Sequence, residues 1–100
     1  MARLKAFELS GFDLWFNSDD HLPPHFHVEK PGAWELKVHF LTDRSEMFEI
    51  VWPKHARNKA GKPKMVELHK IADLVEQRRA ELLDQWQHDV VTKTPGPARQ

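Results

Sequence analysis

Hydrophobic and polar positions alternate with a period of two through much of the first half of the chain. The alternation covers four segments, residues 12–16, 25–30, 34–40 and 47–52. In residues 34–40, Trp34, Leu36 and Val38 fall on one face, and polar side chains fall on the other. This pattern predicts β-strands with one buried and one wet face. Turn-forming residues separate the segments, so we expect an antiparallel meander of about four strands, with room for a further short strand near residues 7–9.

The second half has a different period. Between residues 64 and 89, apolar side chains recur three and four positions apart, at Leu68, Ile71, Ala72, Val75, Leu82, Leu83 and Trp86. This spacing predicts one long amphipathic helix packed on the apolar face of the sheet, which makes an α+β fold. Such a helix would be about 39 Å long, whereas a six-residue strand spans only about 20 Å. The helix must therefore break near Arg78 and Arg79 or overhang the sheet; we expect an overhang and a homodimer formed through it.

The length and composition suit a single soluble domain. We assign residues 1–91 to one domain and residues 92–100 to a disordered tail. The chain has fifteen basic and fifteen acidic residues, so no net charge directs it to nucleic acid, although its two halves carry opposite charges. It has no cysteine, which excludes disulfides and thiolate metal sites. We find neither a signal peptide nor a membrane span, so we expect a cytoplasmic protein.

The segment DDHLPPHFHVE, residues 19–29, carries the candidate chemistry. Its alternation puts His25 and His27 on the polar face of their strand. Phe26 and Val28 can meet apolar partners across the next hairpin only if the loop has an odd number of residues. A three-residue loop places Val28 opposite Leu36. The same register puts His27 opposite Lys37 and His25 opposite His39, so the three histidines form a triangle on the polar face.

Three imidazoles so arranged could bind a divalent metal such as zinc. His25, His27 and His39 would be the ligands, with a water in the fourth position. Without a metal, His25 and His27 could act as a general acid and base, oriented by Glu29 or Asp13. Two further interpretations stay open: an ordinary polar sheet face, or a surface that contacts a partner. In the last case the binding residues would include His21, Trp15 and Lys37.

A basic segment lies between the last predicted strand and the helix. Its cations are Lys54, Arg57, Lys59, Lys62 and Lys64. Cations at a helix N-terminus oppose the helix dipole, and a bound anion would remove that conflict. The segment could therefore bind phosphate or RNA, or it could be a solvated loop.

The histidine segment resembles the domain-of-unknown-function family 4160, small bacterial proteins with a His-Phe-His motif. The residues that carry the resemblance are His21, Pro23, Pro24, His25, Phe26, His27 and Glu29, together with Leu82, Leu83 and Trp86. The resemblance implies a β-rich α+β domain. It also implies a gene next to one for a second small protein, an arrangement suggestive of a toxin–antitoxin-like module. His39 is outside the motif, so its place in the triangle rests on register alone.

Two functions follow from these observations. We expect a binding component of a two-gene module, whose His-rich sheet face and basic loop contact a protein partner from the neighbouring gene, or RNA. The alternative is a metal-dependent or histidine-based hydrolase, such as a ribonuclease. The sequence leaves open whether the protein is an enzyme.

Overall fold

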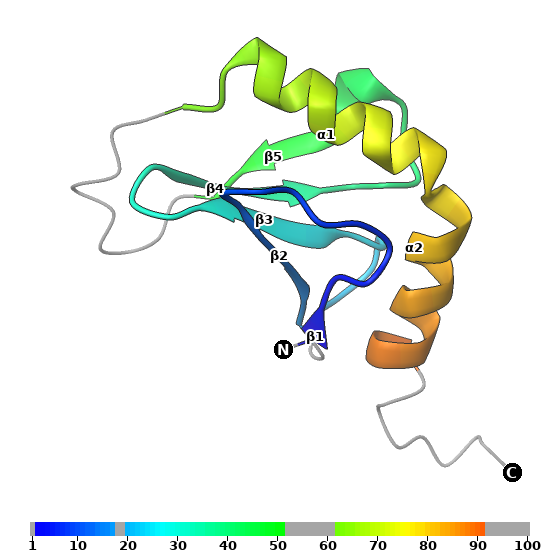
Figure 1. The fold of residues 1–100 in the computed structure, drawn as a ribbon. Coiled ribbons are helices and arrows are strands. Elements are labelled where there is room, and N and C mark those ends of the chain that lie inside the picture. The colour runs from blue at the N-terminus through cyan, green and yellow to red at the C-terminus, as the bar shows by residue number, and fades with distance from the viewer. Residues whose placement is uncertain (1, 18–19, 52–61, 92–100) are drawn as a thin grey trace, which may run out of the picture.

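Five strands pair in chain order to form one antiparallel sheet, seen in the computed structural model in Figure 1. They are β1 (Ala2–Arg3), β2 (Asp13–Phe16), β3 (Phe26–Lys30), β4 (Trp34–Val38) and β5 (Phe48–Ile50). The structure describes residues 2–17, 20–51 and 62–91. The meander is confirmed, with one strand more than expected. The additional strand is β1, and residues 7–9 form no strand.

The predicted register between β3 and β4 is confirmed. Val28 lies opposite Leu36 and His27 opposite Lys37. The connecting loop has three residues, and Gly32 adopts a φ of 77° in it. Most side chains disfavour this left-handed backbone, whereas glycine adopts it readily. The turn and the alternating pattern therefore specify the same pairing.

The helical half of the chain is broken at Arg78, one of the two outcomes that its length allowed. Its elements are α1 (Met65–Gln77), α2 (Arg79–Trp86) and η2 (Gln87–Val91), a π-helical turn. The expected overhang is wrong, because the helix breaks at Arg78, where α2 turns away from the line of α1 (Figure 1). Arg79 donates from Nε to the carbonyl oxygen of Phe40, at 2.6 Å, which holds the break against the sheet. The bend keeps the apolar face of α2 on the sheet.

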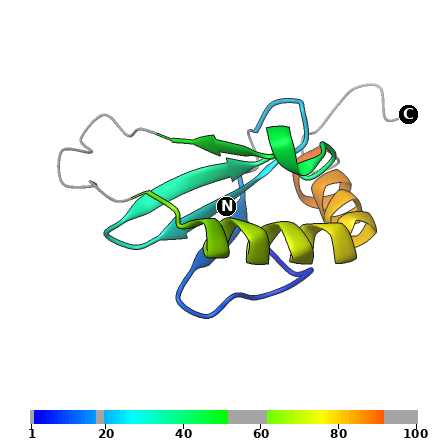
Figure 2. The ribbon, with the colours of Figure 1, turned by 90° about the horizontal axis from the view of Figure 1, so that it is seen from above.

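Aromatic side chains fill the core between the sheet and the helices. Phe16 is fully buried, and its ring meets those of Phe26, Phe40 and Trp86 edge to face. Figure 2 shows α1 lying along one side of the sheet. A short 3-10 helix, η1 (Arg44–Glu46), precedes β5. The α+β class is therefore confirmed, with an apolar sheet face toward the helices and a polar face away from them.

Gln85 of α2 ties the N-terminal segment to the helices. This residue is only 7% exposed, and its Oε1 accepts a hydrogen bond of 2.8 Å from the backbone N–H of Lys5. Its Nε2 donates to the carbonyl oxygen of Arg3, also at 2.8 Å. The amide thus satisfies backbone groups next to β1 that have no further strand to pair with.

Some expectations are not addressed by these elements. The predicted tail, residues 92–100, lies outside the described residues. We expected a homodimer because a single long helix would overhang the sheet. The structure has two shorter helices, α1 and α2, in its place, so the argument for the homodimer no longer applies. Within the described part of the chain, no helix has the length and apolar character needed to cross a bilayer.

Candidate metal centre

The two motif histidines lie at the start of β3, on the polar face of the sheet. His25 precedes the strand and His27 belongs to it, and each is only 5% exposed. Residues 20–24 form the loop that enters β3. Asp20 is held there by two contacts with Asn17: its N–H donates to the Asn17 carbonyl oxygen, and its Oδ2 accepts from the Asn17 N–H at 3.0 Å. The carboxylate of Asp20 consequently reaches both imidazoles.

Asp20, His25 and His27 form a set of groups that could hold a metal ion. One potential ligand atom from each residue lies within 4.8 Å of the other two. The Asp20 Oδ1 atom is 3.5 Å from His25 Nε2 and 3.2 Å from His27 Nε2. Ligands bound to zinc at 2.0–2.1 Å in a tetrahedron are about 3.3–3.4 Å apart. Both distances to Asp20 therefore fit two edges of a zinc coordination sphere.

Hydrogen bonding prepares His25 to act as a ligand. Its Nδ1 lies 2.9 Å from the carbonyl oxygen of Pro23, which can only accept, so Nδ1 carries the proton. The lone pair is then on Nε2, the atom that faces Asp20. Burial lowers the pKa of His25, outweighing the opposing effects of the Pro23 hydrogen bond and of Asp20. A neutral imidazole oriented through its second nitrogen is the usual state of a metal-binding histidine.

His27 is enclosed from several sides. The Trp15 ring stacks on it at 5.3 Å with an interplanar angle of 13°. Its buried Nδ1 makes no hydrogen bond to the described residues, and the nearest acidic oxygen, Glu35 Oε2, is 3.7 Å away. Its Nε2 lies 3.2 Å from both carboxylate oxygens of Asp20 and 3.2 Å from the Nδ2 atom of Asn17. With the proton on Nε2, His27 donates to the Asp20 carboxylate. With the proton on Nδ1, Nε2 accepts from the Asn17 amide and offers the lone pair that a cation beside Asp20 would take.

His39, the third histidine of the predicted triangle, lies beside this set. Its ring is 5.6 Å from that of His25, so register did bring these two residues together. Its Nε2, however, contacts Glu49 Oε1 at 3.1 Å. The hydrogen bond from His39 is the main cause of a lowered pKa of Glu49. His39 is thus paired with Glu49, and Asp20 completes the cluster in its place.

The other predicted site residues are distributed around the fold. His21 and Lys37 line the same pocket as the cluster, a pocket of about 450 Å³. Glu29 lies opposite Asp13 and Glu35 and lines a separate pocket. It follows His27 by two positions on one strand, so both residues are on the same face of the sheet. Among the described residues, Asp20 and Glu35 also contact His27.

The basic segment is only partly described. Lys54, Arg57 and Lys59 lie outside the described residues. Lys62 and Lys64 are exposed at the start of α1 and do not line the histidine pocket.

An acidic side chain, Glu67, offsets the unfavourable interaction of these cations with the helix dipole. The Glu67 carboxylate accepts the backbone N–H of Lys64 and the ammonium of Lys30, each at 2.9 Å. These contacts, the Lys64 hydrogen bond foremost, lower the pKa of Glu67. The external anion that we considered for this position is therefore not required.

Two acidic residues of the site were missed at the sequence level. Asp20 lies in the quoted motif, but its position depends on a loop that alternation does not describe. Glu35 lies opposite Glu29 on β4, and its carboxylate approaches the diagonal neighbour His27. The available signal was the spacing Asp-x4-His-x-His in residues 20–27.

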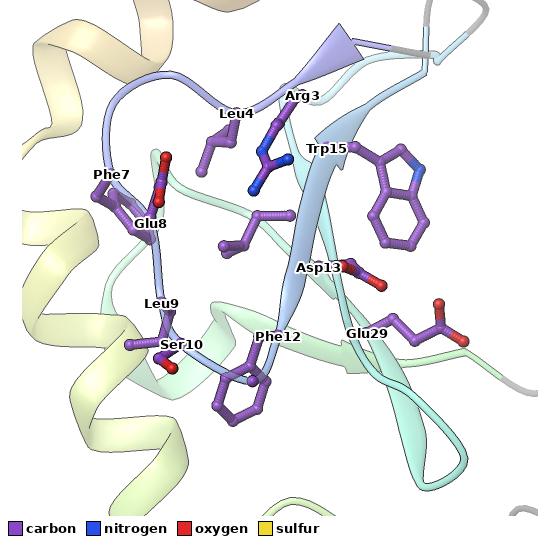
Figure 3. A pocket seen from close by; sticks show the side chains of 12 residues that line it. Arg3, Leu4, Phe7, Glu8, Leu9, Ser10, Phe12, Asp13, Trp15 and Glu29 are labelled. Carbon is purple, nitrogen blue, oxygen red and sulfur yellow. The ribbon is translucent and has the colours of Figure 1, made fainter.

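A larger pocket, of about 880 Å³, lies between the N-terminal loop and β2 (Figure 3). Leu4, Phe7 and Phe12 contribute apolar walls, and Arg3 and Glu8 are among its charged residues. It contains no histidine, and the groups that could hold a metal in the described part of the chain lie elsewhere. The larger pocket therefore has no metal-binding set of its own among the described residues, and the candidate metal centre is the smaller pocket.

One family model matches most of the chain. Residues 11–87 match the family model described as "Domain of unknown function (DUF4160)". The matched range contains β2 through α2 and all three candidate ligands, whereas β1 lies before it. Neither the curated proteins nor the solved structures include a match to the chain.

Proposed function

The chain belongs to the DUF4160 family, and we propose that it works through one divalent metal ion bound by Asp20, His25 and His27. The observation that carries this proposal is the distance from Asp20 Oδ1 to the two Nε2 atoms, 3.5 and 3.2 Å. Two imidazoles and a carboxylate suit Zn²⁺, for which nitrogen and oxygen ligands are common. The Nδ1–H of His25 on Pro23 supports the same assignment, since it leaves Nε2 free to bind.

Metal-assisted hydrolysis is the reaction class that this ligand set favours. Three protein ligands leave one position of a tetrahedral ion for a small molecule, as in catalytic rather than structural zinc sites. The ligand atoms border a pocket of about 450 Å³, through which a substrate could reach that position. A divalent ion there would supply Lewis acidity to the bound molecule. The chain's own contribution is to orient the His25 imidazole through Pro23 and the Asp20 carboxylate through Asn17.

Burial argues against direct recognition of a partner by the motif histidines. His25 and His27 are each 5% exposed and offer little surface to another molecule. A partner from a neighbouring bacterial gene, in a two-gene module in the cytoplasm, is a second candidate function. The exposed Leu22, 76% accessible at the rim of the histidine pocket, favours it. Loss of a complex with that gene product on Leu22→Ser, measured by size-exclusion chromatography, would support it.

The metal proposal is tested by metal content and titration. Untagged protein is analysed by inorganic mass spectrometry, and Zn²⁺ is then titrated into chelator-treated protein by calorimetry. We expect one ion per chain in the wild type. Loss of a residue that only orients a metal ligand already costs about 10–100-fold in affinity, so Asp20→Asn and His27→Ala, which alter ligands themselves, should bind at least about a hundredfold more weakly. His88→Ala, which removes an exposed imidazole on η2, is the matched control and should bind like wild type.

Three results would overturn the assignment. They are an absence of metal together with no zinc affinity tighter than about 10 μM, binding that survives Asp20→Asn, or equal losses in the His88→Ala control. Circular dichroism of each variant separates loss of a ligand from loss of the fold.

A further inference from the structure

We infer that the metal pocket takes an anionic phosphoryl group and that Lys37 is the residue that binds it. This inference rests on the metal site proposed above and specifies its substrate class. Lys37 lies on β4 between His27 of β3 and Glu49 of β5, its two cross-strand partners. Its side chain lines the same pocket as Asp20, His25 and His27. The candidate ion and this ammonium group therefore border one space.

Lys37 is available to a ligand. Within the part of the chain that the structure describes, it makes no hydrogen bond and no ion pair. The acid nearest along the sheet is its partner Glu49, which contacts His39 Nε2 at 3.1 Å. Lys30, one strand away, is by contrast held by Glu67 at 2.9 Å. The charge of Lys37 interacts with the Glu49 carboxylate across the strands, but its three donors make no hydrogen bond to the described residues, so an anion or water must satisfy them.

The charge of the pocket points to the same class of ligand. Among its lining residues, Asp20 and Glu49 are acidic and Lys37 is the basic residue. With neutral histidines and a divalent ion, the pocket has a net charge of one positive unit. A carboxylate ligand would neutralise it. A phosphate ester can additionally place one oxygen on the ion and another on the ammonium, because it presents several charged oxygens on one atom.

Chemistry separates this role from metal binding. The Lys37 ammonium group has no lone pair to offer an ion, whereas Asp20, His25 and His27 supply the converging ligand atoms, so loss of Lys37 should leave the ion in place. Lys37 is not one of the cations that the sequence analysis expected to bind phosphate. Two of those cations, Lys62 and Lys64, are described by the structure, and neither lines this pocket. Lys37 would therefore bind the substrate in the pocket, apart from the residues that would hold the ion.

The test uses full-length protein loaded with one Co²⁺ per chain, with inorganic phosphate as the probe. Phosphate that binds at the ion should change the visible d–d absorption, and the titration gives its affinity. We expect Lys37→Gln to weaken phosphate binding at least tenfold while Co²⁺ affinity stays unchanged. Lys37→Arg should retain most of the binding, since the charge is kept. Lys70→Gln, which removes an exposed charge on α1, is the matched control.

The outcomes distinguish the two proposals. Protein that binds no Co²⁺ overturns the metal site itself. Protein that binds Co²⁺ but shows no spectral response to phosphate, an equal response to acetate, or an unchanged affinity in Lys37→Gln overturns the phosphoryl inference alone. Turnover of 4-nitrophenyl phosphate and of bis(4-nitrophenyl) phosphate by the zinc-loaded protein then separates monoesters from diesters, and Lys37→Gln should slow the preferred substrate at least tenfold.

Discussion

The Nδ1 atom of His25 lies 2.9 Å from the carbonyl oxygen of Pro23, two residues earlier in the chain. Because the carbonyl can only accept, this short-range contact places the imidazole proton on Nδ1 and the lone pair on Nε2. The free nitrogen then faces Asp20 Oδ1 at 3.5 Å. A local contact thus sets the chemical state of a residue that takes part in a longer-range cluster.

The tautomer and acidity of His25 can be measured directly. We expect metal-free protein at pH 7 to have a neutral His25 with its proton on Nδ1, and a pKa below the ordinary 6.5, chiefly because burial disfavours the charged form. Long-range ¹H–¹⁵N correlation spectra over a pH titration report both properties. A proton on Nε2, or a pKa above 6.5, would contradict the assignment.

The same shift makes stability depend on pH. In the unfolded chain, histidine binds a proton near pH 6.5, whereas folded His25 binds it only at lower pH. Between these values the unfolded state holds more protons, so the free energy of unfolding falls as the pH drops below about 6.5. Urea unfolding of metal-free protein between pH 5 and 7.5 should show this slope. His25→Gln should flatten it, and an unchanged slope in the variant would remove His25 as its source.

Zinc should stabilise the folded protein, because the unfolded chain does not assemble the three ligands. At a free concentration of a hundred times Kd, a ligand specific to the native state adds about 2.7 kcal/mol. For a domain of this size, about 1 kcal/mol corresponds to a shift in Tm of some 4–8 °C. We therefore expect a rise of at least 10 °C by scanning calorimetry. It should disappear in Asp20→Asn and persist in His88→Ala; a rise shared by all three proteins would indicate nonspecific binding.

Gln85 should matter for stability far more than its exposed neighbours. Replacing it with methionine keeps the volume but leaves the Lys5 N–H and the Arg3 carbonyl without their 2.8 Å partners. An unsatisfied buried polar group costs about 1–3 kcal/mol, so we expect Gln85→Met to lower the free energy of unfolding by at least about 1 kcal/mol. Gln77→Met, at an exposed position of α1, should change it by less than about 0.5 kcal/mol. Equal effects of the two variants would show that the Gln85 contacts contribute little.

Local rules predicted the sheet well because they act over a few residues. The alternation of Phe26 and Val28 with His25 and His27 decided which face each side chain takes. A three-residue loop at Gly32 then left one register in which the apolar residues of β3 and β4 meet. Both rules depend on neighbouring positions alone, so they hold whatever surrounds the hairpin.

Local rules failed where the outcome depends on distant contacts. The periodicity of α1 and α2 is continuous through Arg78, yet the helix breaks there, where the Arg79 guanidinium binds the carbonyl of Phe40 across the domain. A straight helix would carry its distal apolar residues beyond the sheet, so burial of Leu82 and Trp86 favours the bend. The Arg79 hydrogen bond and the burial of the distal residues both depend on the sheet, so the spacing of residues along the helix does not reveal them.

The sequence by itself determined that His27 lies on the polar face of a strand with His25 just before it, and that this strand pairs with residues 34–38. Only the tertiary structure decided that Asp20, rather than His39, joins them. Strand periodicity specifies direction at each position, whereas the path of the loop that carries Asp20 depends on its contacts with Asn17. Strand register likewise brought His39 close to the site, but its Nε2 forms a hydrogen bond with Glu49 on the next strand.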